Sequence, residues 1–387
     1  MHGPAGPFLL TSGIARLGAG VEGLAFLVFF ELETGSFVVA GLAIGAFTIT
    51  SGALAPVRGR LVDLHGAAAL AGFTLAFAAT NAAVLIIAAA GGASDLVWVL
   101  LSGLAGVVVP PFSGWTRAAL AVRLGGREVE LAFSIDGVLE EISFVAGPLV
   151  AGGLVALGSP EAAISLAAAL SLFGGIALIA RPALRAWRPA RRERSRPEVA
   201  RAPLNRPLLI AIGSLAGVGA ALGLTEVAIT AFSEERGNTG SAGIVLAVLS
   251  LAGIAGALLL GSRESRMAIA TRHALLIAWL AGGLALLPLA GSEVALAVLA
   301  IVPGLALTPI FVTNALLVGR LAAGDPSAAA FSGVTTAVNG GFGLGAAVAG
   351  VVVEGPGIDA AFLLAALSAL AGLAIASAPS LRPGAPG

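Results

Sequence analysis

The sequence predicts an all-α membrane protein whose twelve transmembrane helices form two pseudo-symmetric bundles of six helices. Three observations predict this fold class: an excess of apolar residues, the spacing of uncharged stretches, and an internal repeat. Of the 387 residues, 58% are hydrophobic, 54 are glycine and only 11% are charged. Soluble domains carry about 25% charged residues. Most of the surface of this protein must therefore face lipid.

The uncharged stretches have the length that a bilayer requires. A hydrocarbon core about 30 Å thick is crossed by about 20 apolar residues in a helix. In the first half of the chain we expect spans at 8–30, 35–57, 67–90, 95–116, 133–157 and 160–180. In the second half we expect spans at 207–232, 239–261, 268–290, 292–317, 328–353 and 358–378. The first stretch lacks a basic leader and a cleavage site, which favours a span over a signal peptide.

The basic residues predict the orientation of these spans. Positive charge near short loops stays on the cytoplasmic side of a membrane. With the N-terminus inside, the outer loops carry only Arg236, and Arg16 lies within the first span; the other 19 of the 21 basic residues fall on the inner side. The sequence therefore predicts a multi-pass protein of the inner (plasma) membrane with both termini in the cytoplasm.

The one long polar stretch divides the chain. Residues 181–206 carry nine arginines and several prolines. We interpret this stretch as a cytoplasmic linker held near the anionic inner leaflet rather than as a nucleic-acid patch. The predicted domains are therefore an N-terminal six-helix bundle at 1–180, the linker at 181–206, and a C-terminal six-helix bundle at 207–387.

An internal repeat supports the division into two halves. A shift of 198 positions lays residues 132–134 on 330–332, Phe144 on Phe342, and Gly147 on Gly345. The fifth predicted span thus corresponds to the eleventh, and both run in the same direction. Parallel repeats related by an axis along the membrane normal are typical of transporters built from two bundles.

The loop between the second and third spans contains a spaced motif. Asp63 follows Gly59 by four residues, and Gly66 follows Asp63 by three. Glycine allows a tight backbone, and a carboxylate at a helix end can cap the N-terminus of an opposing helix. This loop resembles the loop motif of the major facilitator superfamily, in which the carboxylate latches the two bundles. The basic residues that follow in that family are replaced here by alanines 67–69.

The fifth span contains Gly147, Pro148 and Gly152. This segment is similar to the glycine and proline motif of drug-proton antiporters in the same superfamily. Small residues also allow ordinary close packing of helices, so this second interpretation stays open. The resemblance covers the whole chain and implies the superfamily fold in a branch of bacterial exporters.

Five carboxyl groups lie within the predicted spans, where a charge costs about 2.5 to 3.5 kcal/mol on insertion scales. We expect Asp136 to be a cap near the inner surface. The neighbouring Glu140 and Glu141 should not both ionise in a poorly hydrated region, so one of them could load and release a proton. In the alternative, one of the two pairs with Arg117 or Arg123 and has a structural role.

The remaining two acids are Glu22 in the first span and Glu226 in the seventh. The family resemblance implies that these two helices line a central cavity from opposite sides, which makes this pair the leading candidate for binding cargo or protons. Arg16 either reaches that cavity or pairs with an acid. Asn314 and Asn339 are further polar candidates, although asparagine in a span more often bonds across a helix interface.

The composition also limits the cargo and the energy source. The chain has no tyrosine, four tryptophans and 17 phenylalanines, which leans toward apolar or amphipathic cargo. It lacks a phosphate-binding loop, cysteine and any spaced set of metal ligands. We therefore expect a monomeric, proton-coupled exporter of small molecules without a cofactor. The alternatives are a metabolite symporter or uniporter of the same fold and, from another class, an intramembrane enzyme that modifies lipids.

Overall fold

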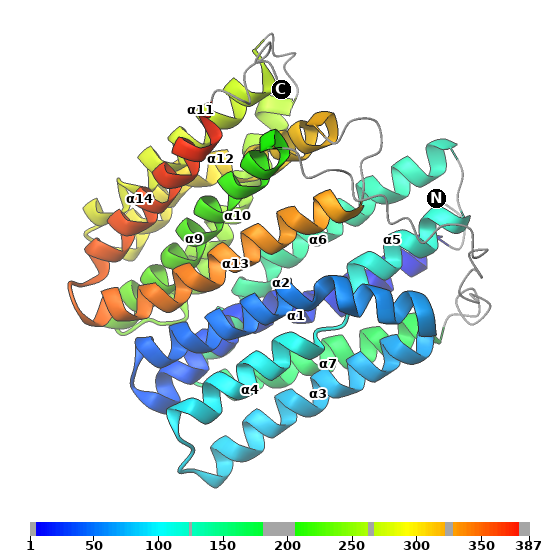
Figure 1. Ribbon diagram of the computed structural model, residues 1–387. Coiled ribbons are helices and arrows are strands. Elements are labelled where there is room, and N and C mark those ends of the chain that lie inside the picture. The colour runs from blue at the N-terminus through cyan, green and yellow to red at the C-terminus, as the bar shows by residue number, and fades with distance from the viewer. Residues whose placement is uncertain (1–4, 124–125, 181–205, 262–266, 322–327, 379–387) are drawn as a thin grey trace.

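The computed structural model describes residues 5–123, 126–180, 206–261, 267–321 and 328–378, and the regular structure of these residues is entirely helical (Figure 1). The first half contains α1 (Ala5–Thr34), α2 (Phe37–His65), α3 (Ala67–Ala90), α4 (Asp95–Val108), α5 (Phe112–Arg123), α6 (Gly126–Ala156) and α7 (Pro160–Ile179). The second half contains α9 (Arg206–Glu235), α10 (Ser241–Gly261), α11 (Ile269–Leu284), the short helix η1 (Leu287–Leu289), α12 (Glu293–Leu321), α13 (Ala328–Glu354) and α14 (Ile358–Ala376). Most of the linker predicted at 181–206 lies outside the described residues.

Twelve segments in the described part of the chain are long and apolar enough to cross a bilayer, which confirms the predicted number. The helices extend further than the uncharged stretches do. The first continues to Thr34 instead of ending at residue 30, and the second continues through Pro56 to His65 instead of ending at residue 57. A helix needs apolar side chains only where it is surrounded by lipid, so charged residues can continue its backbone hydrogen bonding beyond the membrane.

The fourth span is broken, and a buried arginine holds the break. Pro110 and Pro111 follow α4 and lack backbone N–H groups, so the last carbonyls of α4 lose their usual helical donors. The guanidinium of Arg58, which is 5% exposed, donates to the carbonyls of Gly106 at 3.0 Å and Val107 at 3.4 Å. A cation at the C-terminal end of a helix also interacts favourably with its dipole. Arg58 therefore donates hydrogen bonds to carbonyl groups that lack a helical donor because of the prolines.

Glycines bring helices of one bundle into backbone contact, and they do so in the same way in both halves. A Cβ atom on Gly147 of α6 would lie 2.3 Å from the carbonyl oxygen of Gly20 in α1. At the equivalent position of the repeat, a Cβ atom on Gly345 of α13 would lie 2.2 Å from the carbonyl oxygen of Ala220 in α9. The repeat in the sequence therefore corresponds to a repeated packing arrangement.

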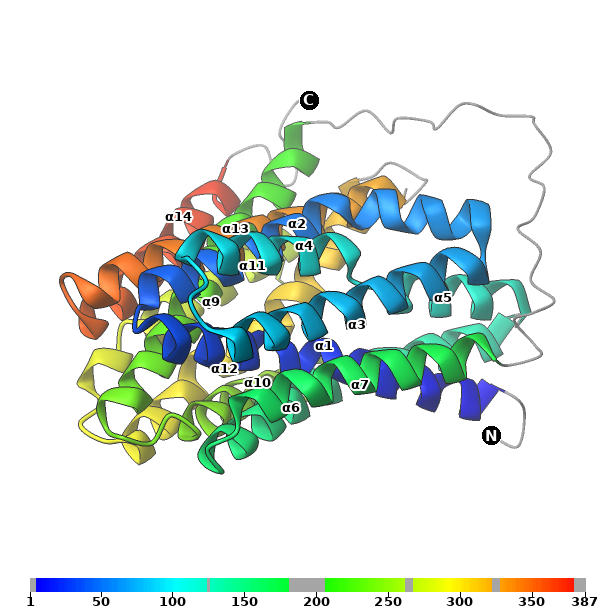
Figure 2. The same ribbon diagram turned by 90° about the horizontal axis from the view of Figure 1, so that it is seen from below.

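The two bundles meet along α2 and α13, which lie side by side (Figures 1 and 2). The carboxylate of Glu354 accepts hydrogen bonds from the Ser36 hydroxyl at 2.7 Å and from the Val38 backbone N–H at 2.9 Å. Next along the same pair of helices, a Cβ atom on Gly41 would lie 2.4 Å from the carbonyl oxygen of Ala346. One end of this interface is therefore closed by direct contact.

The second contact between the bundles joins α6 and α10. A Cβ atom on Gly152 would lie 2.4 Å from the carbonyl oxygen of Gly240, and one on Gly243 would lie 2.1 Å from the carbonyl oxygen of Pro148. These residues lie at the same end of the helices as Ser36 and Glu354. We call this end of the molecule the closed end.

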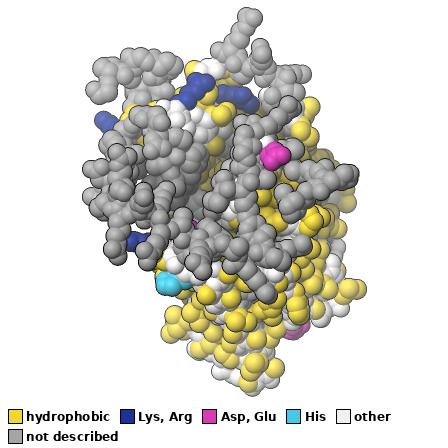
Figure 3. All heavy atoms as spheres, turned by 90° about the vertical axis from the view of Figure 1, so that its right-hand side faces the viewer, with side chains coloured by type: hydrophobic (Ala, Val, Ile, Leu, Met, Phe, Trp, Pro, Cys, Tyr) yellow, Lys and Arg dark blue, Asp and Glu magenta, His cyan; other side chains and the backbone are white. Residues whose placement is uncertain are grey.

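The opposite end carries the start of α1 and the end of α14, because an even number of spans returns the chain to the side where it began. Figure 3 views the molecule from this side: basic side chains show near its upper edge, and hydrophobic side chains cover its lower part. This distribution is typical of a bundle whose flanks face lipid.

The break in the fourth span yields a stability prediction. Replacing Arg58 by alanine should lower the free energy of unfolding by about 1 to 3 kcal/mol, because buried carbonyls lose their charged donor. Arg60→Ala is the matched control, since Arg60 is exposed two residues further along α2. Thermal unfolding in detergent measures both variants. Equal melting temperatures for the two would contradict this role of Arg58.

Candidate functional site

A cavity of about 400 Å³ lies between the two bundles. It is lined by α1, α2 and α6 of the first half and by α9, α10, α12 and α13 of the second. We call it the central cavity. Most of its lining is aliphatic or aromatic, and its phenylalanines are Phe47, Phe144, Phe311 and Phe342. Its polar side chains are Thr48, Thr225, Glu226, Ser250, Thr308 and Asn339.

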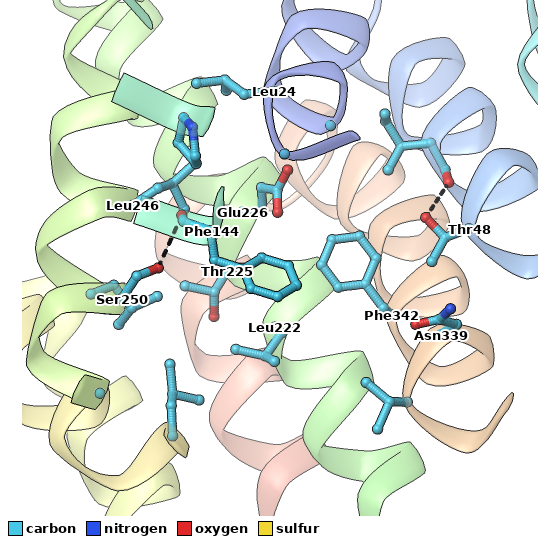
Figure 4. Close-up of a pocket in the computed structure, with 18 of the residues that line it drawn as sticks. Leu24, Thr48, Phe144, Leu222, Thr225, Glu226, Leu246, Ser250, Asn339 and Phe342 are labelled. Atoms are coloured by element: carbon cyan, nitrogen blue, oxygen red, sulfur yellow. Dashed lines mark hydrogen bonds between the residues drawn. The ribbon is translucent and has the colours of Figure 1, made fainter. Parts of the chain in front are cut away.

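Glu226 is the only ionisable side chain among the described residues that line the central cavity. It projects from α9 toward α1, and its Oε1 atom lies 3.6 Å from the place that a Cβ atom on Gly23 would occupy (Figure 4). Its carboxylate makes no hydrogen bond or ion pair with any described residue. The site therefore presents one acid without a counter-ion at a place where the facing helix has no side chain.

Glu22 lies elsewhere, which corrects the expectation that it faces Glu226 across the cavity. The residues of α1 that line the cavity are Ala19, Gly20, Gly23 and Leu24. At about 100° per residue, Glu22 points to another face of the helix. Its side chain is fully buried beside Asn81 of α3, inside the first bundle. The depth of Glu22 in the membrane follows from the sequence, but the direction of its side chain depends on the rotation of the helix.

A network of charged side chains joins α1, α5 and α6. The carboxylate of Asp136 is fully buried and accepts hydrogen bonds from Arg16 at 2.6 Å and from Arg117 at 2.7 Å. Arg117 also pairs with Glu140, and Arg16 lies 4.0 Å from the same carboxylate. The expectation that Asp136 is an interfacial cap is wrong, because two guanidinium groups compensate its charge. Of the two alternatives for Glu140, the structure shows the ion pair with Arg117.

The structure places the two asparagine candidates in different parts of the molecule. Asn339 lines the central cavity, whereas Asn314 is fully buried inside the second bundle. There Asn314 donates to the Ala211 carbonyl at 2.8 Å and lies 3.4 Å from Nε2 of His273, a residue that sequence reasoning missed. Asn314 thus bonds across a helix interface. The side chain of Glu141 lies outside the described residues.

The family model described as Major Facilitator Superfamily matches residues 8–269, well over half of the chain. The chain belongs to the major facilitator superfamily. Members of this superfamily are transporters rather than enzymes. No curated protein matches the sequence. In the described residues, no group of three His, Asp or Glu side chains is placed to hold a metal ion.

Solved structures resemble the whole chain. A point mutant of the nucleoside transporter NupG has 18% sequence identity and a TM-score of 0.74, and the match covers 95% of this chain and 99% of that one. NupG itself gives 17% identity and a TM-score of 0.73, with coverage of 96% and 98%. A bacterial homologue of the iron transporter ferroportin in an inward-facing state gives 15% identity and a TM-score of 0.71, with coverage of 97% and 98%. At these identities the likeness shows the fold.

The superfamily loop motif lies at the end of the molecule opposite the closed end. Gly66 has a φ of +61°, and its N–H donates to the Val62 carbonyl, so it ends α2 in a tight turn that leads directly into α3. Asp63 is exposed and makes no hydrogen bond or ion pair with a described residue. Within the described part of the chain, Asp63 therefore does not cap an opposing helix. A Cβ atom on Gly59 would also meet no neighbour within 4 Å.

The motif in α6 borders both the cavity and the interface between the bundles. Pro148 lines the central cavity, Gly147 contacts α1 and Gly152 contacts α10. The close packing that was expected from the small residues is thus present on two sides of α6. Any change in the spacing of α6 and α10 would also change the wall of the cavity.

The charged network yields a prediction for Asp136. Asp136→Asn should destabilise the protein by roughly 3 to 5 kcal/mol, because the buried guanidinium of Arg16 loses its 2.6 Å ion pair and keeps only the contact with Glu140 at 4.0 Å. The double variant Arg16→Gln with Asp136→Asn should recover part of this loss, since no buried charge then remains unpaired. Thermal unfolding in detergent measures both variants. A single variant as stable as the native protein would contradict this assignment.

The glycine contact between α6 and α10 yields a prediction for the closed end. Gly152→Leu should push these helices apart, whereas Gly153→Leu should not, because a Cβ atom on Gly153 meets no neighbour within 4 Å. The chain has no cysteine, so a single Ser241→Cys reports accessibility without background. Ser241 is 6% exposed, and its cysteine should react faster with a maleimide in the Gly152→Leu background. Equal labelling rates in the two leucine backgrounds would refute a closed end held by this contact.

Proposed function

We propose that the protein is a secondary active transporter that exports hydrophobic or amphipathic small molecules in exchange for protons. The observation that carries this proposal is the central cavity between the bundles, which has apolar walls and one carboxylate without a partner. Rocking of two bundles about such a site would expose it to each side of the membrane in turn. The cargo and the lipid bilayer are then the partners of a monomeric protein.

The exposure of one cavity residue and the contacts at the closed end support access to the cavity from the end opposite the closed end. The Phe144 side chain lines the cavity and is 58% exposed, whereas the contacts of α2 with α13 and of α6 with α10 close the other end. Positive charge marks the cytoplasmic side of membrane proteins, and both termini are predicted to lie there. The cavity would then be reached from the cytoplasm, as an exporter requires when it takes up cargo.

The proton gradient is the proposed energy source. The chain contains no lysine and hence no Gly-x-x-x-x-Gly-Lys loop for phosphate. An ionised carboxylate without a counter-ion is costly in an apolar cavity, so Glu226 should bind a proton when no other cation is present. Protonation and cargo binding at one group would couple the two fluxes.

Uptake of a metabolite by symport or uniport is the second candidate, since a transporter of nucleosides shares the fold. Everted and right-side-out vesicles distinguish the two directions. A panel of compounds should be screened in proteoliposomes with an imposed pH gradient. Accumulation in everted vesicles supports export, and accumulation in right-side-out vesicles supports uptake.

The proton site yields a direct prediction. Glu226→Gln should reduce transport driven by a pH gradient to the level seen without a gradient, because the amide cannot bind and release the proton. The matched control is Glu235→Gln, an exposed acid at the end of the same helix. Proteoliposomes loaded with the best compound of the panel measure both variants.

Full pH-gradient dependence in Glu226→Gln would remove this residue from the mechanism. Glu22→Gln belongs in the same series, because Glu22 is the second proposed proton site although it lies inside the first bundle. A loss of coupling in Glu22→Gln alone would move the proton site to α1.

A further inference from the structure

Three of the four hydroxyl side chains that line the central cavity donate their proton to a backbone carbonyl, and the fourth hydroxyl belongs to Thr308. A threonine or serine hydroxyl has one proton to donate and keeps lone pairs that accept. Thr48 and Thr225 each donate to the backbone carbonyl four residues earlier, at 2.8 Å and 2.7 Å. Ser250 is directed in the same way at the Phe144 carbonyl, at 3.5 Å (Figure 4). These side chains therefore offer acceptors to a ligand rather than donors.

The carboxylate of Glu226 likewise offers acceptors to a ligand. Glu226 can only accept hydrogen bonds when it is ionised. The facing positions are Gly20 and Gly23 on α1, Phe144 and Pro148 on α6, and aliphatic side chains on α10, so no titratable group among the described residues of the neighbouring elements compensates it. The nearest acid along α1, Glu22, points into the first bundle. A ligand that carries both a positive charge and N–H donors would compensate this carboxylate most fully.

Two aromatic rings stand beside this acid. Phe144 of α6 and Phe342 of α13 occupy equivalent positions of the repeat, and Figure 4 shows their rings near each other in the cavity. Phenylalanine rings favour offset or edge-to-face contact with another aromatic group. Asn339, whose amide has protons to donate, lies on the far side of Phe342 from Glu226 (Figure 4). The donors and the acid are thus at different places in the cavity.

From this arrangement we propose that the central cavity binds an aromatic ammonium ion, in which a protonated primary or secondary amine is attached to a flat aromatic body. The amine donates to the carboxylate of Glu226, and the aromatic body lies against Phe144 and Phe342. This inference rests on the transport function proposed above and names its class of cargo. A proton and the ammonium ion each carry one positive charge and compete for one carboxylate, so their exchange leaves the charge of the cavity unchanged.

The test compares three probes that share one aromatic body: naphthylethylammonium, its N-trimethylated derivative and naphthylethanol. Isothermal titration calorimetry on the detergent-purified full chain measures binding without any gradient. The native protein should bind the ammonium roughly tenfold or more tightly than the alcohol, the value of one charge-assisted hydrogen bond. The trimethylated probe, which has no N–H donor, should lose most of that advantage.

Variants show whether the preference comes from the acid. Glu226→Gln should bind the ammonium and the alcohol equally, while retained binding of the alcohol shows that the cavity is still folded. Glu226→Asp should keep part of the preference, and Glu235→Gln should keep all of it. The proposal is overturned if the native protein does not prefer the ammonium, if Glu226→Gln keeps the preference, or if the trimethylated probe binds as tightly as the ammonium.

Failure of this proposal and failure of the proposed function give different results. If naphthylethylammonium does not bind but a neutral compound of the panel is still driven by the pH gradient, the protein is a proton-coupled transporter with another class of cargo. If the ammonium binds and no compound moves with the gradient, the chemistry of the site is correct and the coupling is wrong.

Discussion

Close approach of helix backbones determines where the helices of this protein pack directly against each other and where a cavity remains between them. Inside lipid no hydrophobic force draws helices together, so they associate through van der Waals packing at small residues. Gly20 with Gly147 and Gly152 with Gly240 bring α6 against α1 on one side and against α10 on the other. The central cavity lies between the bundles, where α6 and α13 carry the larger residues Phe144 and Phe342.

The same constraint governs the charges. Within the first bundle the buried Asp136 is matched by Arg16 and Arg117, and at the break in the fourth span the buried Arg58 is matched by backbone carbonyls. Each of these groups has its compensation inside the protein, as a low-dielectric environment demands. Glu226 has none among the described residues. An uncompensated charge in a cavity is a site for a ligand, whereas a compensated one is part of the framework.

The sequence predicts the fold better than it predicts the site. The twelve spans and the repeat follow from hydropathy and from one offset, because a bilayer imposes a fixed length on every helix. The depth of each acid follows as well, and Glu226 lies in the cavity. The rotation of a helix is set by its packing against neighbours, so the sequence does not show that Glu22 points into the first bundle or that Asp136 meets Arg16 and Arg117. His273 was missed because a single histidine has no spacing pattern that signals a partner such as Asn314.

The contact between α6 and α10 has a consequence for the energetics of conformational exchange. Its atoms are mostly backbone, and helical carbonyls such as those of Pro148 and Gly240 lie in segments whose hydrogen bonding is largely internal. Parting the helices therefore gives up dispersion contacts without stranding many donors or acceptors. When the free energies of the closed and the parted conformation differ little, both conformations are populated. A ligand that binds one of them modestly better then shifts the equilibrium toward that conformation.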